Sequence, residues 1–363
     1  MFNTPRPFLM VVIVFSYVLT GCSVVGPRAV SKSSVDYNLV LSKVNNEQLL
    51  LNLVRLRYRD TPFFMETASL STGFSFDTAL GATLQLNPSK LESYTLSGPN
   101  LTYGEKPTIT YTPLQGDKFI KEMLSPMNLN VLMLLYHSGW SIERLLRVTI
   151  QRLNESMNAP TASGPTPDIT PEYKSFQEIA KLFRHLQKKR AITLAQNEEG
   201  NKVFVTISPT QHNSSEVQAF LQALNLDTSR LQFALVPSLD NMISDNNQTI
   251  SIHPRSMLAS MYYLSQAVEV PQRDQAAGRV TVTRDESGEV FDWNQVTHNL
   301  FRVQSALSYP QNAYIAVKYR GAWFYIDDSD LDSKSTFSLL TQLLALQSSE
   351  TKSNAPVLTI PVQ

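Results

Sequence analysis

Four aspartates near the C-terminal end of the chain form the densest group of residues that could do chemistry. Asp327, Asp328, Asp330 and Asp332 follow a predicted strand and precede a predicted helix. Carboxylate oxygens are the ligands that calcium prefers, but a helix–loop–helix calcium loop has glycine at its sixth position and glutamate at its twelfth. Counted from Asp327, those positions hold Asp332 and Ser338. Aspartate and serine at these positions are also typical of a cap on the next helix. We therefore predict a helix cap and no metal, and calcium binding by this loop stays open as the alternative.

Motifs for covalent catalysis are absent from the sequence. It contains no Gly-x-Ser-x-Gly elbow, no phosphate-binding glycine loop and no His-Glu-x-x-His pair. Ser349 and Lys352 have Ser-x-x-Lys spacing, but they lie in a polar stretch close to the last residue. The five histidines show no ligand spacing, and we predict no cofactor. Two carboxylates for glycan hydrolysis stay open as an alternative, because sequence does not show their separation in space.

The only cysteine, Cys22, follows a segment typical of export signals. That segment has a polar start with Arg6 and an apolar run from Phe8 to Leu19. The run is far shorter than the roughly 20 residues that a helix needs to cross the hydrocarbon core. The pattern therefore predicts a cleaved signal peptide over residues 1–21 rather than a membrane-spanning helix.

The residues Leu19, Thr20, Gly21 and Cys22 resemble the lipobox of bacterial lipoproteins. The resemblance implies that a signal peptidase recognises Leu19, Thr20 and Gly21, and that Cys22 becomes the first residue. Its sulfur would carry a diacylglyceryl group and its amino group an acyl chain such as palmitate. Several acyl chains hold a protein on a membrane, at roughly 0.8 kcal/mol per buried CH₂. The alternative is an ordinary secretory signal with an incidental thiol.

The residue after the cysteine indicates whether a lipoprotein is kept in the inner membrane or sent to the outer membrane. In lipoproteins of bacteria with two membranes, aspartate at this position commonly signals retention in the inner membrane, and here the residue is Ser23. The resemblance therefore implies the periplasmic face of the outer membrane. Residues 22–34 hold Gly26, Pro27 and several serines without apolar periodicity, which predicts a short lipid-anchored tether.

Composition excludes several classes of function. The 363 residues include 31 Lys and Arg against 31 Asp and Glu, a formal net charge of zero. A neutral chain has no long-range field for a phosphate backbone, so we predict no nucleic-acid partner. One cysteine permits neither an internal disulfide nor a cysteine-rich zinc site.

Apolar periodicity and turn residues predict an α+β protein with two domains of mixed antiparallel sheet and helices. We expect an N-terminal α+β domain over residues 35–157, a Pro-rich linker over 158–171 and a C-terminal α+β domain over 172–363. In the first domain we predict helices at 35–58, 117–124, 129–136 and 142–153, and strands at 63–76, 79–86, 93–101 and 108–112. In the second we predict helices at 172–189, 215–224, 256–267 and 337–346, and strands at 191–195, 202–208, 231–236, 249–252, 301–306, 313–319, 322–326 and 357–360.

Three arginines at the end of the first predicted helix have two interpretations. Arg55 and Arg59 are one helical turn apart, whereas Arg57 lies on another face. Positive residues at a helix C-terminus are stabilised by the helix dipole, which is the structural interpretation. The alternative is a surface that contacts a partner or a lipid headgroup.

Three phrases are more specific than general packing requires. They are Arg55-Leu-Arg-Tyr-Arg-Asp-Thr-Pro62, Pro107-Thr-Ile-Thr-Tyr-Thr-Pro-Leu-Gln-Gly116 and Trp323-Phe-Tyr-Ile-Asp-Asp328. Together they resemble a family of uncharacterised proteobacterial outer-membrane lipoproteins, from about Asp36 to the C-terminus. The resemblance implies no activity and assigns no functional residues.

An anchor, a tether and two α+β domains without a catalytic motif are typical of a protein that binds. We therefore expect a structural or accessory subunit of an envelope assembly, in secretion or transport, with other envelope proteins as partners. One alternative is an envelope hydrolase acting on peptidoglycan or lipid, which requires a deep polar pocket. Another is a carrier of an apolar ligand, which requires a large dry cavity.

Overall fold

The computed structural model describes residues 37–79, 82–83, 95–96, 100–114, 116–200, 202–238, 247–348 and 358–361. Its contacts divide the chain into two compact units, Met1–Gln48 and Leu49–Gln363. In the first unit residues 37–48 are helical, and Lys43 Nζ lies 3.9 Å from Glu47 Oε1. The predicted signal peptide and tether lie outside the described residues.

The first nine residues of the second unit are helical, and the spacing of their apolar residues explains this. Residues 49–57 are helical, and Leu49, Leu50, Leu53 and Val54 repeat at the three- and four-residue steps of a buried helix face. The helix predicted over 35–58 is confirmed, with helical residues running from 37 to 57.

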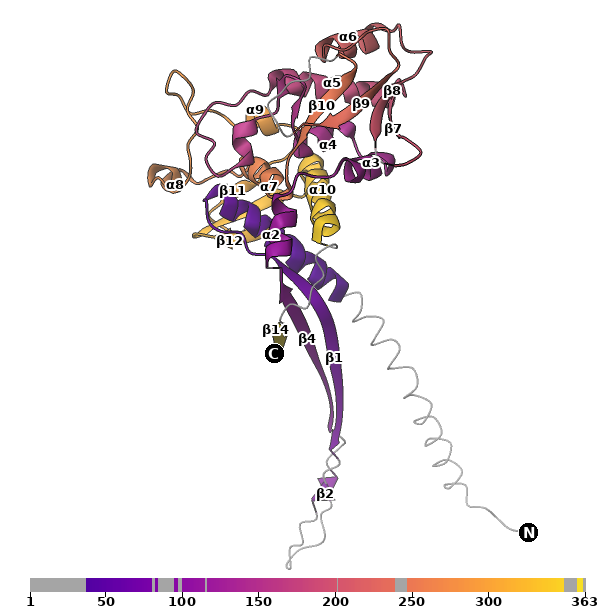
Figure 1. Ribbon diagram of the computed structural model, residues 1–363. Coiled ribbons are helices and arrows are strands. Elements are labelled where there is room, and N and C mark those ends of the chain that lie inside the picture. The colour runs from indigo at the N-terminus through magenta and orange to yellow at the C-terminus, as the bar shows by residue number, and fades with distance from the viewer. Residues whose placement is uncertain are drawn as a thin grey trace, which may run out of the picture. The chain divides into compact units, whose positions relative to one another are not determined.

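The second unit contains a six-stranded mixed sheet, whose strands β7 to β10 are labelled in Figure 1. Its strand order is β6 (Ser156–Met157), β5 (Ile150–Leu153), β10 (Thr249–Pro254), β9 (Gln232–Pro237), β8 (Val203–Ile207) and β7 (Ile192–Gln196). Only β9 and β10 pair in parallel, and the other neighbours are antiparallel. The hairpin predicted at 191–195 and 202–208 is confirmed.

Helices cover this sheet with apolar residues. They are α3 (Leu129–His137), α4 (Ile142–Thr149), α5 (Lys174–Lys188) and α6 (Ser215–Ala223). The α5 helix contacts β6 and β7 as well as α4 and α6. Phe183 of α5 meets Phe220 of α6 edge to face, with 5.0 Å between ring centroids.

A second sheet has three antiparallel strands in the order β11 (Gln304–Ala306), β13 (Ala322–Asp327) and β12 (Ala313–Tyr319). Helices α7 (Met257–Ser265) and α10 (Leu331–Ser348) pack against each other and against α2 (Asp117–Leu124). Met257, Met261, Tyr263 and Leu264 are buried, as predicted for the helix at 256–267. The short helices α8 (Gln272–Ala276) and α9 (Asn294–Thr297) lie between α7 and β11 in the sequence.

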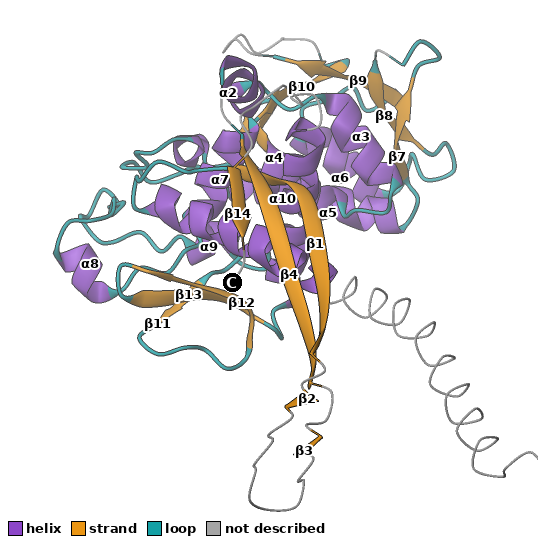
Figure 2. Cartoon of the chain, turned by 90° about the horizontal axis from the view of Figure 1, so that it is seen from below, coloured by secondary structure: helices purple, strands orange, loops and turns teal. Residues whose placement is uncertain are grey.

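A long two-stranded ribbon forms the third feature. Strand β1 (Met65–Ala79) pairs antiparallel with β4 (Asn100–Pro113), and β14 (Leu358–Pro361) joins the other edge of β4 (Figure 2). Between them in sequence, β2 (Ala82–Thr83) pairs with β3 (Thr95–Leu96). The α+β class is as predicted.

The Pro-rich segment 158–171 is not a linker in the structure. The sheet continues across it, because β5 and β6 precede it while β7 to β10 follow it. Residues Pro160–Ser163 form the 3-10 helix η1, and Ala159 and Ala162 are fully buried. The prolines here therefore belong to a packed turn between strands of one sheet.

Arg255 explains why this segment is folded. Its side chain is 1% exposed and donates to the carbonyl oxygens of Ile150 (2.8 Å), Arg147 (3.2 Å) and Asn158, and to Ser163 Oγ (2.9 Å). The guanidinium carbon lies 4.1 Å from the Tyr263 ring centroid. One buried cation thus joins β5, η1 and α7.

Two local predictions were also wrong. The helix predicted over 142–153 ends at Thr149, and Ile150–Leu153 continues as strand β5. The four strands predicted between residues 63 and 112 are mainly two long ones, because Gly73 and Pro107 lie inside paired strands rather than in turns.

Candidate functional site

The base of the β1–β4 ribbon contacts the rest of the second unit through described residues on both sides of the two strands. The Asn52 side chain donates to Phe63 O at 2.8 Å and accepts from Phe63 N at 2.9 Å. The next residue, Phe64, accepts from Leu114 N at 2.9 Å and meets the Phe119 ring with 5.6 Å between centroids. Asn52 is 2% exposed, so a buried amide fixes the point where the chain enters the ribbon.

Beyond this base the ribbon is a continuous antiparallel ladder. Pairing runs from Met65↔Pro113 to Ala79↔Asn100, with one irregularity between Thr67 and Ser69. At about 3.3 Å per residue such strands span roughly 45 Å. The β4 edge opposite β1 pairs with β14 only from Tyr111 to Thr108. In the described residues no strand pairs with the rest of that edge, or with the outer edge of β1.

Each open edge carries backbone hydrogen-bonding groups. In an antiparallel pair alternate residues bond to the partner strand, and the N–H and C=O groups of the others point away from it. Native proteins usually cover or interrupt such edges, because they are templates for pairing with another chain. An isolated two-stranded ribbon is marginally stable in water. The ribbon therefore has the properties of a docking element.

The residue types of the two paired strands alternate with a two-residue period along the register. One set of alternate register positions is mainly large or apolar in sequence: Leu70, Thr72, Phe74, Phe76, Thr78, Leu101, Tyr103, Glu105, Pro107 and Ile109. The other set is small or polar: Ser69, Ser71, Gly73, Ser75, Asp77, Ala79, Asn100, Thr102, Gly104, Lys106, Thr108 and Thr110. This two-residue alternation was not predicted from the sequence, because Gly73 and Pro107 are residue types that usually interrupt strands.

The three arginines predicted as a possible partner surface are not brought together as one patch. Arg57 donates to Gln266 Oε1 and to Thr281 O, each at 3.1 Å, and Arg59 Nε donates to Thr281 Oγ1 at 2.8 Å. Burial lowers the pKa of Arg57 to about 10. Arg55 lies within electrostatic range of Asp60. These residues hold the end of the first helix against the loop after α8.

The aspartates of the predicted calcium loop have separate protein partners. Asp330 Oδ1 accepts from Ser333 N at 2.9 Å at the start of α10, and Asp327 Oδ1 accepts from Ser329 N at 2.9 Å. Asp328 pairs with Lys334 and Asp332 with Arg144. The capping interpretation is confirmed for Asp330. In the described part of the chain no group of three or more His, Cys, Asp or Glu could hold a metal ion.

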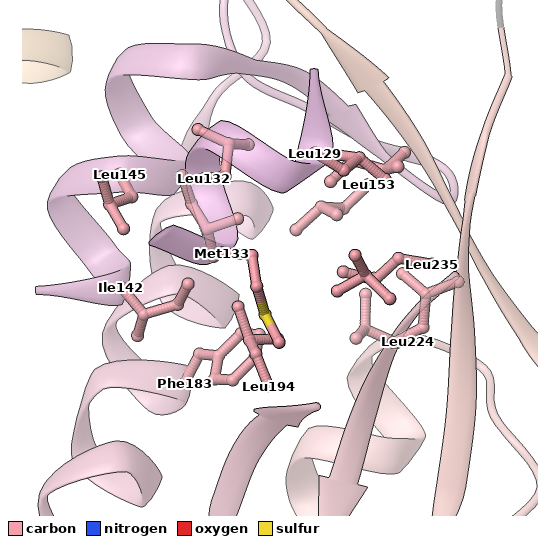
Figure 3. A pocket seen from close by; sticks show the side chains of 14 residues that line it. Leu129, Leu132, Met133, Ile142, Leu145, Leu153, Phe183, Leu194, Leu224 and Leu235 are labelled. Carbon is pink, nitrogen blue, oxygen red and sulfur yellow. The ribbon is translucent and has the colours of Figure 1, made fainter. Parts of the chain in front are cut away.

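An enclosed apolar cavity lies between the six-stranded sheet and its helices (Figure 3). Its volume is about 30 Å³, and its lining includes Leu132, Met133, Phe183 and Leu194. An engineered apolar cavity that binds benzene has a volume of about 150 Å³. This cavity is therefore far smaller than a lipid chain requires, and it does not support the carrier alternative.

A larger groove of about 670 Å³ opens between the start of α3 and the strands β8 and β9. Its polar residues are Asn128, Asn130 and Lys202. Asn128 Oδ1 caps α3 by accepting from Asn130 N, and Asn130 Oδ1 accepts from Gln196 Nε2 at 3.1 Å. The lining of this groove contains no carboxylate, histidine or hydroxyl residue, so it does not supply the acid–base pair that a hydrolase requires.

The predicted lipidation site, Cys22 with Leu19, Thr20 and Gly21, lies outside the described residues. None of the helices in the described ranges is both long and apolar enough to span a membrane. Comparisons of the chain with protein-family models, with curated proteins and with solved structures found no match. The ribbon is therefore identified as the candidate site from its own geometry.

Proposed function

We propose that the protein is a lipid-anchored subunit of an envelope assembly at the periplasmic face of the outer membrane, and that the β1–β4 ribbon docks it there. The observation that carries the proposal is the ribbon itself. Its strands have 15 and 14 residues, and among the described residues a third strand covers four positions of one edge. A partner that supplies strands and apolar surface would stabilise it.

The anchor supports the same proposal from the sequence. The Leu19-Thr20-Gly21-Cys22 resemblance implies lipid on Cys22, and lipid would keep the second unit close to one membrane. The lining of the larger groove contains no acid–base pair, and the smaller cavity has too little volume for a lipid chain. A secretion or transport assembly is the class of partner that we propose.

A shortened ribbon tests this proposal with the rest of the chain intact. Replacing residues 72–107 by Asn-Gly joins Ser71 to Thr108, which are already paired, through a favoured two-residue hairpin turn. The pairs between β14 and β4 remain. An affinity tag fits in the exposed turn at Glu198 and Glu199.

Both chains would be crosslinked in intact cells, extracted from the outer membrane in detergent and purified through the tag. The proposal predicts a near-stoichiometric set of envelope proteins with the full ribbon and loss of that set with the shortened ribbon, at equal amounts of folded, membrane-bound protein. Recovery of the full-length protein alone contradicts the proposal. Recovery of the same set with both chains contradicts the role of the ribbon.

A further inference from the structure

Three arginines from separate parts of the second unit converge beside the end of the first helix. Arg273 belongs to α8, Arg279 follows α8, and Arg320 lies in the turn between β12 and β13. Arg273 Nε and Arg279 Nη1 lie 3.8 and 2.6 Å from the same oxygen, Asp274 Oδ1. Arg273 Nη2 also donates to Arg320 O at 2.8 Å, and Figure 2 shows α8 beside the three-stranded sheet. We call Arg273, Arg279 and Arg320 the arginine cluster.

We propose that the arginine cluster binds the phosphate group of an anionic lipid headgroup. The protein would then contact its membrane in a second place, besides the proposed lipid on Cys22. The inference rests on the proposed function for the source of the phosphate, because an anchor would keep the second unit close to one membrane. It does not depend on the ribbon.

The surroundings of the cluster carry more positive than negative charge. Arg320 pairs with Asp60, and Arg55 lies within electrostatic range of the same carboxylate. With Arg273 and Arg279 on Asp274, four guanidinium groups share two carboxylates, an excess of two positive charges. The formal net charge of the whole chain is zero. The excess is therefore local, and it attracts an anion to this part of the surface.

The cluster is held in place, and its donors are accessible. The Asp274 side chain is 0% exposed, whereas those of Arg273 and Arg279 are 48% and 49% exposed. In the described part of the chain, Arg279 donates through Nη1 and Arg273 through Nη2, and a guanidinium group has further N–H donors. The buried carboxylate thus orients two guanidinium groups whose remaining donors can bind a ligand.

Aromatic rings orient the third member of the cluster. The guanidinium carbon of Arg320 lies 5.1 Å from the ring centroid of Tyr58 and 5.5 Å from that of Tyr319. Its side chain is 37% exposed. Groups that are already ordered lose less conformational entropy when a ligand binds.

The chemistry of arginine favours phosphate as the ligand. The planar guanidinium group presents pairs of N–H donors that match two oxygens of one phosphate, whereas a lysine ammonium acts as a point charge. A carboxylate of an acidic peptide has a similar geometry. The proposed anchor favours the lipid over the peptide, because it would hold headgroups near the cluster at a high effective concentration.

Vesicle binding by the purified, full-length Cys22→Ser chain tests the inference, because this chain carries no lipid on residue 22. It would be mixed with vesicles of phosphatidylglycerol and phosphatidylcholine in equal parts, or of phosphatidylcholine alone, and the bound fraction measured by flotation. Arg273→Gln removes one cation of the cluster. The matched control is Arg230→Gln, an exposed arginine in the loop before β9 of the six-stranded sheet. Each variant is first required to show the thermal transition of the parent chain.

The inference predicts binding to the anionic vesicles that far exceeds binding to phosphatidylcholine alone. Arg273→Gln should weaken that binding about fivefold, as expected for one arginine at an anionic surface, and Arg230→Gln should leave it unchanged. Absence of binding to the anionic vesicles overturns the inference. Equal losses with Arg273→Gln and Arg230→Gln also overturn it, because they would indicate general attraction between charges.

Two further probes distinguish the source of the anion. Millimolar inorganic phosphate and poly-glutamate would each be added to the Cys22→Ser chain without vesicles, and the thermal midpoint measured. An increase that Arg273→Gln abolishes, in a chain that does not bind anionic vesicles, assigns the cluster to a free phosphate or to an acidic peptide and overturns the lipid. Failure of the inference in any of these ways leaves the purification with the shortened ribbon as a separate test of the proposed function.

Discussion

Tyr58 donates its phenolic hydrogen to Asp274 Oδ2 at 2.7 Å, although 216 residues separate the two in the sequence. The Asp274 side chain is fully buried, and its other oxygen accepts from Arg279 Nη1 at 2.6 Å. The Tyr58 ring meets Tyr319 and Phe324 edge to face, at 5.7 and 6.1 Å between centroids. This contact joins the end of the first helix, from which the chain enters the ribbon, to α8 and to the three-stranded sheet.

Tyr58→Phe tests this contact through its dependence on pH. Burial opposes ionisation of Asp274, but hydrogen bonds from Tyr58 and Arg279 and the nearby guanidinium charges outweigh it and lower its pKa below the ordinary value. A lowered carboxyl pKa stabilises the folded state above the unfolded pKa of about 3.9, and this contribution is lost as the pH falls through the folded pKa. Tyr58→Phe raises that folded pKa.

We expect Tyr58→Phe to cost about 1–3 kcal/mol in the free energy of unfolding at pH 7, because a buried carboxylate loses a donor. The deficit should shrink as the pH falls through the folded pKa of Asp274 in the variant towards the lower one in the unmodified chain, because the carboxyl is then protonated in both folded states. Urea denaturation at several pH values measures it. Tyr309→Phe is the control, since Tyr309 is 52% exposed. A deficit that does not change with pH would show that Asp274 is not the group involved.

Arg255→Met tests the buried cation that joins β5, η1 and α7. The change leaves the carbonyl oxygens of Arg147, Ile150 and Asn158 without this donor, and each buried polar group left unsatisfied costs about 1–3 kcal/mol. We expect a loss of at least about 3 kcal/mol in urea denaturation. Arg230→Met on the surface should stay within about 0.5 kcal/mol of the unmodified chain. Equal effects of the two changes would contradict the role given to Arg255.

Asn52→Leu tests how the base of the ribbon is held. The change removes both hydrogen bonds to the Phe63 backbone at nearly constant volume, and we expect a loss of about 2 kcal/mol. Amide hydrogen exchange should increase at Phe63 and Met65. Asn52→Asp keeps the acceptor for Phe63 N and should have a smaller effect. If exchange at the ribbon base is the same in all three chains, Asn52 does not fix the entry to the ribbon.

Asp330→Ala separates helix capping from calcium binding in the aspartate loop. Loss of the bond to Ser333 N should cost about 1 kcal/mol in the free energy of unfolding, as for other N-caps. Asp328→Ala breaks a pair with Lys334 in which the Asp328 side chain is 65% exposed, and should cost less than about 0.5 kcal/mol. Millimolar calcium should leave the thermal midpoint of the unmodified chain unchanged. A calcium-dependent increase that Asp330→Ala abolishes would establish a metal site.

How far the sequence predicts the fold depends on the range of the interactions. The helices at 35–58, 172–189 and 256–267 and the hairpin at 191–208 were predicted correctly, because periodicity and turn residues are local signals. The change from α4 to β5 at Ile150 was missed, because no glycine or proline marks it and pairing with β10 decides it. The segment 158–171 was misread, because Arg255, about 90 residues later, provides the contacts that order it.

Part of the candidate site could have been predicted from local sequence patterns. The alternation in residues 69–79 and 100–110 is a two-residue period, and treating Gly73 and Pro107 as strand residues would have extended it. Pairing of β14 with β4 joins the chain end to residues near its first third, which no local pattern indicates. No local pattern indicates the hydrogen bond between Tyr58 and Asp274 either, because 216 residues separate them.

Amide hydrogen exchange along the ribbon tests most directly whether it is a docking element. Exchange would be compared between the purified, monomeric Cys22→Ser chain and the anchored chain in isolated outer membranes. The β4 residues 108–111, which pair with β14, serve as the internal reference. Docking through the ribbon predicts equal protection of the reference in both samples, and protection of residues 100–107 and of β1 that rises in the membranes. Unchanged fast exchange of the ribbon in the membranes would contradict docking through it.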